Sequence, residues 1–123
     1  MILFLRITAG FFLFFGVASL MKPTLMIEIP FRLTASGADG KSFLRSGAGG
    51  VTITLGALFL YSAAFPKFAV GATLTAVTVF AGLLIGRVAS FIADGKPSMF
   101  VRVAAFGELL GLAAGCYWLF ATQ

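Results

Sequence analysis

Four long apolar stretches, separated by shorter polar ones, dominate the chain. They cover roughly residues 2–21, 47–65, 68–92 and 99–120. Each is long enough to cross a bilayer as a helix, because about 20 helical residues span a hydrocarbon core of about 30 Å. Stretches this apolar are typical of helices in contact with lipid, which allows a helix to be apolar on every side. The pattern predicts an all-α fold, an integral membrane four-helix bundle that forms a single transmembrane domain over residues 1–123.

The first apolar stretch has a second interpretation, as a cleaved signal peptide. The sequence VAS at 17–19 resembles a small-residue cleavage site. However, Arg6 is the only positive charge near its start, and the apolar run is long for the hydrophobic region of a signal peptide. We therefore expect residues 2–21 to be retained as a membrane helix.

Residues 22–46 are expected to form an interfacial loop, the only long connection. Pro23 ends the first helix, since proline cannot continue the backbone hydrogen-bond ladder. Apolar and polar residues then alternate over 27–33, which favours an extended segment lying at the level of the lipid headgroups. Asp39 and Gly40 are typical of a turn.

A short sequence echo suggests a repeat. The sequence ADGK occurs at 38–41 and again at 93–96, and an arginine follows each copy, at Arg45 and Arg102. Two helices in each half would give the halves the same orientation, so the bundle could be a 2+2 parallel repeat.

Composition and charge support a membrane protein and exclude several classes of function. The chain is 60% hydrophobic and 11% charged, whereas soluble domains are about half apolar and about a quarter charged. There is no histidine, one cysteine (Cys116) and four acidic residues, so we expect no metal site, no cofactor and no histidine-activated nucleophile. The net charge is +5, but the basic residues are dispersed, which argues against nucleic acid and favours membrane lipids as partners.

The distribution of positive charge predicts topology. Most Lys and Arg residues flank the two ADGK segments, while only Arg6 and Lys67 lie toward the other side. Cytoplasmic loops carry the excess of Lys and Arg, so we expect the ADGK side in the cytoplasm and both termini facing outward.

Four charged residues lie inside the predicted spans: Arg6 in the first, Arg87 in the third, and Arg102 and Glu108 in the last. Glu108 falls near the middle of the last helix, where a charge costs at least about 2.5–3.5 kcal/mol unless it is paired, protonated or hydrated. Arg87 is the expected partner, because the axial offset between them is only about 6 Å at 1.5 Å per residue. The pair could fix the register of the two helices or bind the headgroup of a ligand. Alternatively, Glu108 could carry protons in a transporter.

Glycines mark the expected helix contacts, since small residues let membrane helices approach closely. Gly111 and Gly115 follow Glu108 at i+3 and i+7, on nearly the same helix face. The predicted packing positions are Gly82, Gly86, Gly107, Gly111 and Gly115.

The stretch GRVASFIADGKPS at 86–98, followed by Glu108, resembles a family of small bacterial membrane proteins of unknown function, broadly DoxX-like. The most specific part of the resemblance is an element in which a turn motif, Asp94, Gly95 and Pro97, follows Gly86, Arg87 and Ser90. The resemblance implies a four-helix bundle in a bacterial inner membrane, and it implies no catalytic residue.

Three functions stay open at this point. The first is an accessory or binding protein that packs with other membrane chains, as a homo-oligomer or in a larger complex, or that holds a hydrophobic ligand. The second is a proton-coupled small multidrug-type transporter that uses Glu108, although the first helix lacks the acidic residue such proteins carry. The third is a membrane enzyme acting on an apolar substrate with Glu108 and Arg87, which would be a thin catalytic set.

Overall fold

A computed structural model of the chain describes residues 1–121, and no strand occurs among them. Four helical segments within these residues are long and apolar enough to cross a membrane, which confirms the predicted all-α four-helix bundle. The elements in chain order are α1 (Ile2–Met21), the π-helical η1 (Thr24–Glu28), α2 (Ile29–Phe31), α3 (Gly37–Leu44), the π-helical η2 (Arg45–Gly50), α4 (Val51–Ala64), the 3₁₀ turn η3 (Pro66–Phe68), α5 (Ala69–Asp94) and α6 (Met99–Ala121).

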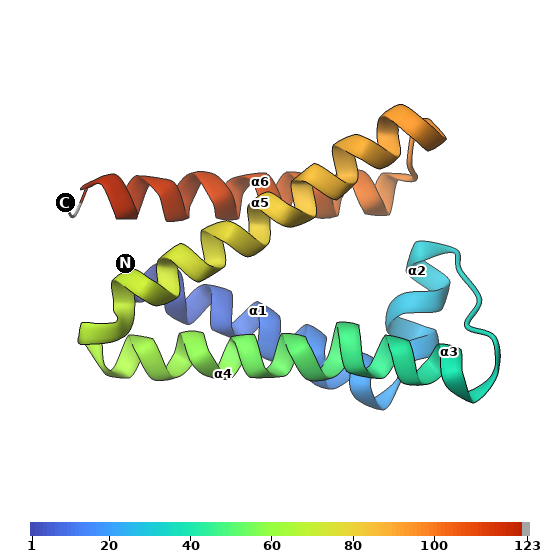
Figure 1. The fold of residues 1–123 in the computed structure, drawn as a ribbon, viewed down its shortest axis with the longest axis horizontal. Coiled ribbons are helices and arrows are strands. Elements are labelled where there is room, and N and C mark those ends of the chain that lie inside the picture. Colours follow the sequence, from blue (N-terminus) through green and yellow to red (C-terminus); the bar gives the residue numbers. More distant parts are fainter. Residues whose placement is uncertain (122–123) are drawn as a thin grey trace.

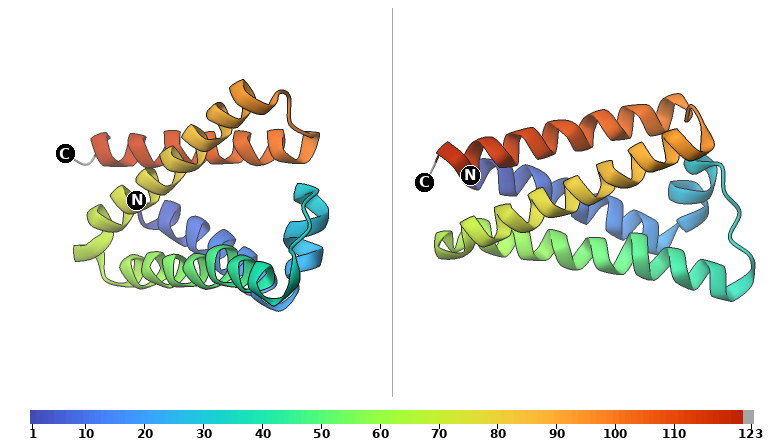
Figure 2. Two further views of the ribbon diagram at one scale, coloured as in Figure 1. Left: turned by 45° about the vertical axis from the view of Figure 1, so that its right-hand side comes forward. Right: turned by 45° about the horizontal axis from the view of Figure 1, so that its top comes forward.

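The bundle is built from two helix pairs. α4 packs mainly against α1, and α5 packs mainly against α6. Figure 1 shows α1 and α4 along one edge of the molecule, with α5 running obliquely from the end of α4 to the start of α6. The start of α1 and the end of α6 lie at the same end of the bundle (Figure 2), as an even number of spans requires.

Glycines bring α1 and α4 into close contact. A Cβ on Gly16 would lie 2.8 Å from the backbone nitrogen of Ile53, and one on Gly56 would lie 3.0 Å from the backbone nitrogen of Leu13. Neither position has room for a side chain, so the two backbones approach closely. Such approach increases dispersion contact, which replaces the hydrophobic effect as a driving force between helices in lipid.

The best-packed part of the bundle lies at the end that holds the N-terminus and the connection between α4 and α5. Leu5 of α1, Phe59 of α4 and Ala76 of α5 are fully buried there. The Phe12 ring lies edge-to-face against Phe59, with ring centroids 5.3 Å apart. Toward the other end, α5 diverges from α4 (Figure 1), and none of residues 81–94 is buried.

The outer surface is apolar over the full length of the helices. Large apolar side chains stand exposed on every long helix, as expected where lipid is the solvent. Among the most exposed are Phe11, Phe14, Ile85, Ile92, Phe106 and Phe120.

The connection between the first two spans differs from the prediction. Residues 24–31 are not extended but form the two short helical turns η1 and α2. Arg32 then reverses the chain with a left-handed backbone (φ 55°). The Glu28 carboxylate accepts a hydrogen bond from the backbone N–H of Ala35 at 3.0 Å, which holds the reversal closed. Because this bond and the burial of Ile27 stabilise the folded-back form, they override the alternating pattern of residues 27–33.

The two ADGK segments have different structures. Residues 38–41 lie inside α3, so Asp39 and Gly40 do not form the expected turn, and the second span begins at Gly37 rather than at Gly47. Residues 93–96 instead end α5, where Gly95 has a positive φ of 88°. The sequence echo is therefore not matched by a structural repeat at these segments.

Candidate ion-pair site between α5 and α6

Arg87 of α5 and Glu108 of α6 form the one ion pair within residues 1–121. Arg87 Nη2 donates to Glu108 Oε1 at 2.7 Å, and Arg87 Nε donates to Glu108 Oε2 at 3.1 Å. Their side chains are 26% and 12% exposed. The guanidinium thus donates a hydrogen bond to each carboxylate oxygen. This bidentate geometry is the one in which such pairs are strongest.

The register of α6 on α5 sets this geometry. Gly111 and Gly115 share a helix face with Glu108, and they pack against Phe80 and Val77 of α5. A Cβ on Gly111 would lie 2.7 Å from the Phe80 ring. These contacts draw the middle of α6 onto α5, so the long Arg87 side chain reaches Glu108 about one turn away along the bundle axis.

An aromatic residue from the folded-back connection covers the pair. The Phe31 ring of α2 lies 5.9 Å from the Arg87 guanidinium carbon, within the range of a cation–π contact. Phe31 also packs edge-to-face on Phe100 of α6, with centroids 5.2 Å apart. The site therefore joins three segments that are far apart in sequence: α2, α5 and α6.

Neither Phe31 nor Phe100 was among the predicted site residues. Phe31 falls in the stretch expected to be extended, and its position over Arg87 depends on the reversal at Arg32. The only sequence signal was the excess of aromatic residues, which does not single out these two.

The turn motif closes the hairpin between α5 and α6. The Ser90 hydroxyl donates to Asp94 Oδ2 at 3.1 Å, and the backbone N–H of Gly95 donates to the Phe91 carbonyl at 3.1 Å. Pro97 is half-buried in the same turn. These residues terminate α5 and direct the chain into α6, so they position the ion pair without contacting it.

The remaining predicted site residues take no part in the ion pair. Arg102 is exposed on α6, and the ion pair of the described residues does not include it. Gly82, Gly86 and Gly107 are exposed, and a Cβ on each would meet no other atom within 4 Å, so they make no close helix contact inside this chain. Gly111 and Gly115 do lie against neighbouring side chains.

The chemistry available at the site is limited to this ion pair. Among residues 1–121, no group of three His, Cys, Asp or Glu side chains lies close enough to hold a metal ion. The Cys116 thiol is free and half-buried. Within the described residues, the hydrogen bonds and ion pair of Arg87 and Glu108 connect them to each other and to no nucleophile. The ion pair can fix two helices against each other or bind a polar group of a ligand.

Comparison with known proteins identifies the family. The model of the family described as "Domain of unknown function (DUF4345)" matches residues 2–120, and the chain belongs to this family. No curated protein and no solved structure matches the chain.

Proposed function

We propose that this member of the DUF4345 family is an accessory membrane protein whose α5–α6 hairpin packs against another membrane chain. One observation carries the proposal. In the most apolar 18-residue stretch of α6, only 6% of the residues are buried inside the chain, against 33% in that of α1. A helix with so few buried residues leaves much of its surface available to other chains or to lipid.

Exposed glycines on this hairpin support a protein neighbour. Gly82 and Gly86 of α5 and Gly107 of α6 leave the helix backbone uncovered. In lipid, such positions favour helix association, because a neighbouring helix can approach the backbone closely and gain dispersion contact. The partner is a second copy of this chain or a chain of a larger complex.

In this proposal the ion pair fixes the register of α5 against α6. A proton-carrying role is disfavoured, because both carboxylate oxygens of Glu108 are held by Arg87 in two charge-assisted hydrogen bonds. The described part of α1 also lacks an acidic residue. An enzyme role is disfavoured because no second acid, base or nucleophile contacts the pair.

We also propose a membrane location and a topology for the protein. The end of the bundle opposite the start of α1 carries Arg32, Lys41, Arg45 and Lys96, which supports a cytoplasmic position for that end. The start of α1 and the end of α6 lie at the opposite end (Figure 2), so both termini would face outward. The small size, the four spans and the motif at 86–98 support a bacterial inner membrane and a DoxX-like affiliation.

The test is extraction of the full chain into native-like lipid particles, followed by mass spectrometry of everything that accompanies it. We expect a second polypeptide, or a second copy, at fixed stoichiometry. Gly107→Leu should fold and lose that partner, since the substitution fills open space in the chain and blocks close approach. The control is Gly10→Leu on α1, which is equally open. A single chain without partner, or equal loss in the control, would overturn the proposal.

A further inference from the structure

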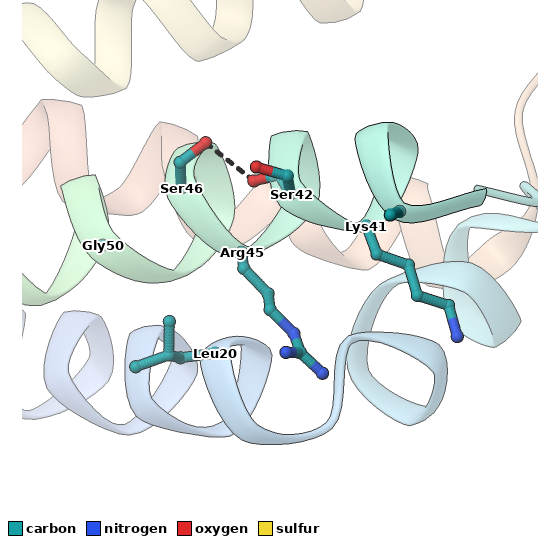
Figure 3. A pocket seen from close by; sticks show the side chains of 7 residues that line it. Leu20, Lys41, Ser42, Arg45, Ser46 and Gly50 are labelled. Atoms are coloured by element: carbon teal, nitrogen blue, oxygen red, sulfur yellow. Dashed lines mark hydrogen bonds between the residues drawn. The ribbon is translucent and has the colours of Figure 1, made fainter. Parts of the chain in front are cut away.

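A groove of about 620 Å³ lies where the end of α1 meets α3 and η2, away from the ion pair. Figure 3 shows Lys41 and Arg45 leaving α3 and η2 on the same side and extending toward the part of the chain where α1 ends. Leu20 of α1 supplies an apolar wall. The lining residues are Leu20, Ala38, Lys41, Ser42, Arg45, Ser46 and Gly50.

Neither cation of the groove forms an ion pair with a carboxylate of the described residues. The one ion pair there is Arg87–Glu108, so neither Lys41 nor Arg45 is neutralised. Asp39 lies two positions from Lys41, about 200° around the helix at 100° per residue, and so faces away from it. The Glu28 carboxylate is engaged by the Ala35 N–H. The groove therefore attracts an anion.

The groove lies at the level of lipid headgroups. The span Gly37–Ala64 has 28 residues, or about 42 Å of helix, against a hydrocarbon core of about 30 Å. The uninterrupted apolar stretch of this span begins after Ser46, so α3 and the start of η2 extend out of the hydrocarbon. Leu20 sits in the last turn of α1, where the apolar stretch of that helix ends.

We propose that this groove binds the phosphate of an anionic glycerophospholipid. The planar fork of Arg45 can donate to two phosphate oxygens, and Lys41 adds a point charge. The Ser42 hydroxyl lines the groove and is available to donate, whereas the Ser46 hydroxyl already donates to the Ser42 carbonyl at 2.9 Å. Leu20 contacts the lipid close to its glycerol, which distinguishes a lipid from free phosphate.

The experiment is native mass spectrometry of the full chain in detergent, with phosphatidylglycerol and phosphatidylcholine of identical acyl chains added in turn. We expect phosphatidylglycerol to bind preferentially. The double variant Lys41→Gln/Arg45→Gln should weaken that binding roughly thirtyfold, since each Lys or Arg near an anionic leaflet strengthens attachment roughly fivefold. Both residues are exposed, so the variant should fold. Arg45→Lys should lose less, because it keeps the charge and loses only the fork.

The matched control is Arg102→Gln, an exposed cation near the same end of the bundle but outside the groove. It should leave phosphatidylglycerol binding unchanged. Equal binding of phosphatidylcholine, or an equal loss in the control, would show that no specific site exists and would overturn the proposal. Displacement of the lipid by inorganic phosphate at equal concentration would overturn the lipid assignment.

Discussion

Removal of the Arg87–Glu108 ion pair, one partner at a time, should reveal how strongly it couples α5 to α6. The perturbations are Arg87→Met, Glu108→Gln and the two together, which keep side-chain volume close to the original. Each single variant leaves one member without its charge partner at a site only 26% or 12% exposed. The double variant leaves no charge at all, so it should cost less than the sum of the two single variants.

The magnitude follows from the two hydrogen bonds in the pair, at 2.7 and 3.1 Å. Interhelical hydrogen bonds in membranes contribute about 0.6 kcal/mol on average and up to about 1.7 kcal/mol. Two such bonds, both charge-assisted, predict a coupling energy of about 1–3 kcal/mol. Each single variant should lower the free energy of unfolding by at least this coupling, and the neutral double variant should recover part of the loss.

The assay is reversible unfolding in mixed micelles with increasing denaturing detergent. The fluorescence of Trp118 on α6, the only tryptophan, reports the state of that helix, and circular dichroism reports total helix. The double-mutant cycle isolates the pairwise energy. A coupling below about 0.5 kcal/mol, the usual error of additivity, would refute the argument that this pair holds the hairpin in register.

Three further predictions concern packing, the connection and topology. Gly56→Leu should destabilise the bundle by about 1–3 kcal/mol through overpacking, while Gly10→Leu, which meets open space, should not; thermal unfolding of both would check this. Phe31→Ala should increase hydrogen exchange in residues 24–36, because the ring contact that holds α2 on α6 is lost; unchanged exchange would contradict that role. In a cysteine-free background, a cysteine at Ser98 should react with a membrane-impermeant thiol reagent only from the cytoplasm, and one at Lys67 only from outside; the reverse pattern would invert the topology.

The spans were predictable because their length and composition are local properties of the sequence. The stretch 2–21 coincides with α1, and 99–120 coincides with α6 to within one residue. The proximity of Arg87 and Glu108 was also predictable, since a short turn makes the two helices antiparallel and places both side chains at similar depth. What this pair does in the membrane stays a prediction.

The connection was not predictable in the same way. Its alternating apolar residues matched an extended segment, but the left-handed backbone of Arg32 and the Glu28–Ala35 hydrogen bond fold it back. Phe31 then packs on Phe100, a residue 69 positions later in the chain. Local propensity is weak evidence when contacts that distant in sequence stabilise the conformation.

Glycine spacing indicated helix contact without indicating which glycines make it inside the chain. Gly16 and Gly56 let the backbones of α1 and α4 approach closely, although neither belonged to the predicted set. Gly82 and Gly86 have the GxxxG spacing but face open space. Because the spacing defines only a helix face, the identity of the neighbour depends on how the helices are arranged.

The most direct test of the central proposal is the mass of the intact assembly released from native-like lipid particles. The proposed function predicts one discrete mass that exceeds a single 12.9 kDa chain by a whole second chain or by a partner polypeptide. It also predicts that this excess disappears in Gly107→Leu. A mass equal to one chain, with or without a bound small molecule, would contradict the proposal that α5 and α6 pack against another protein.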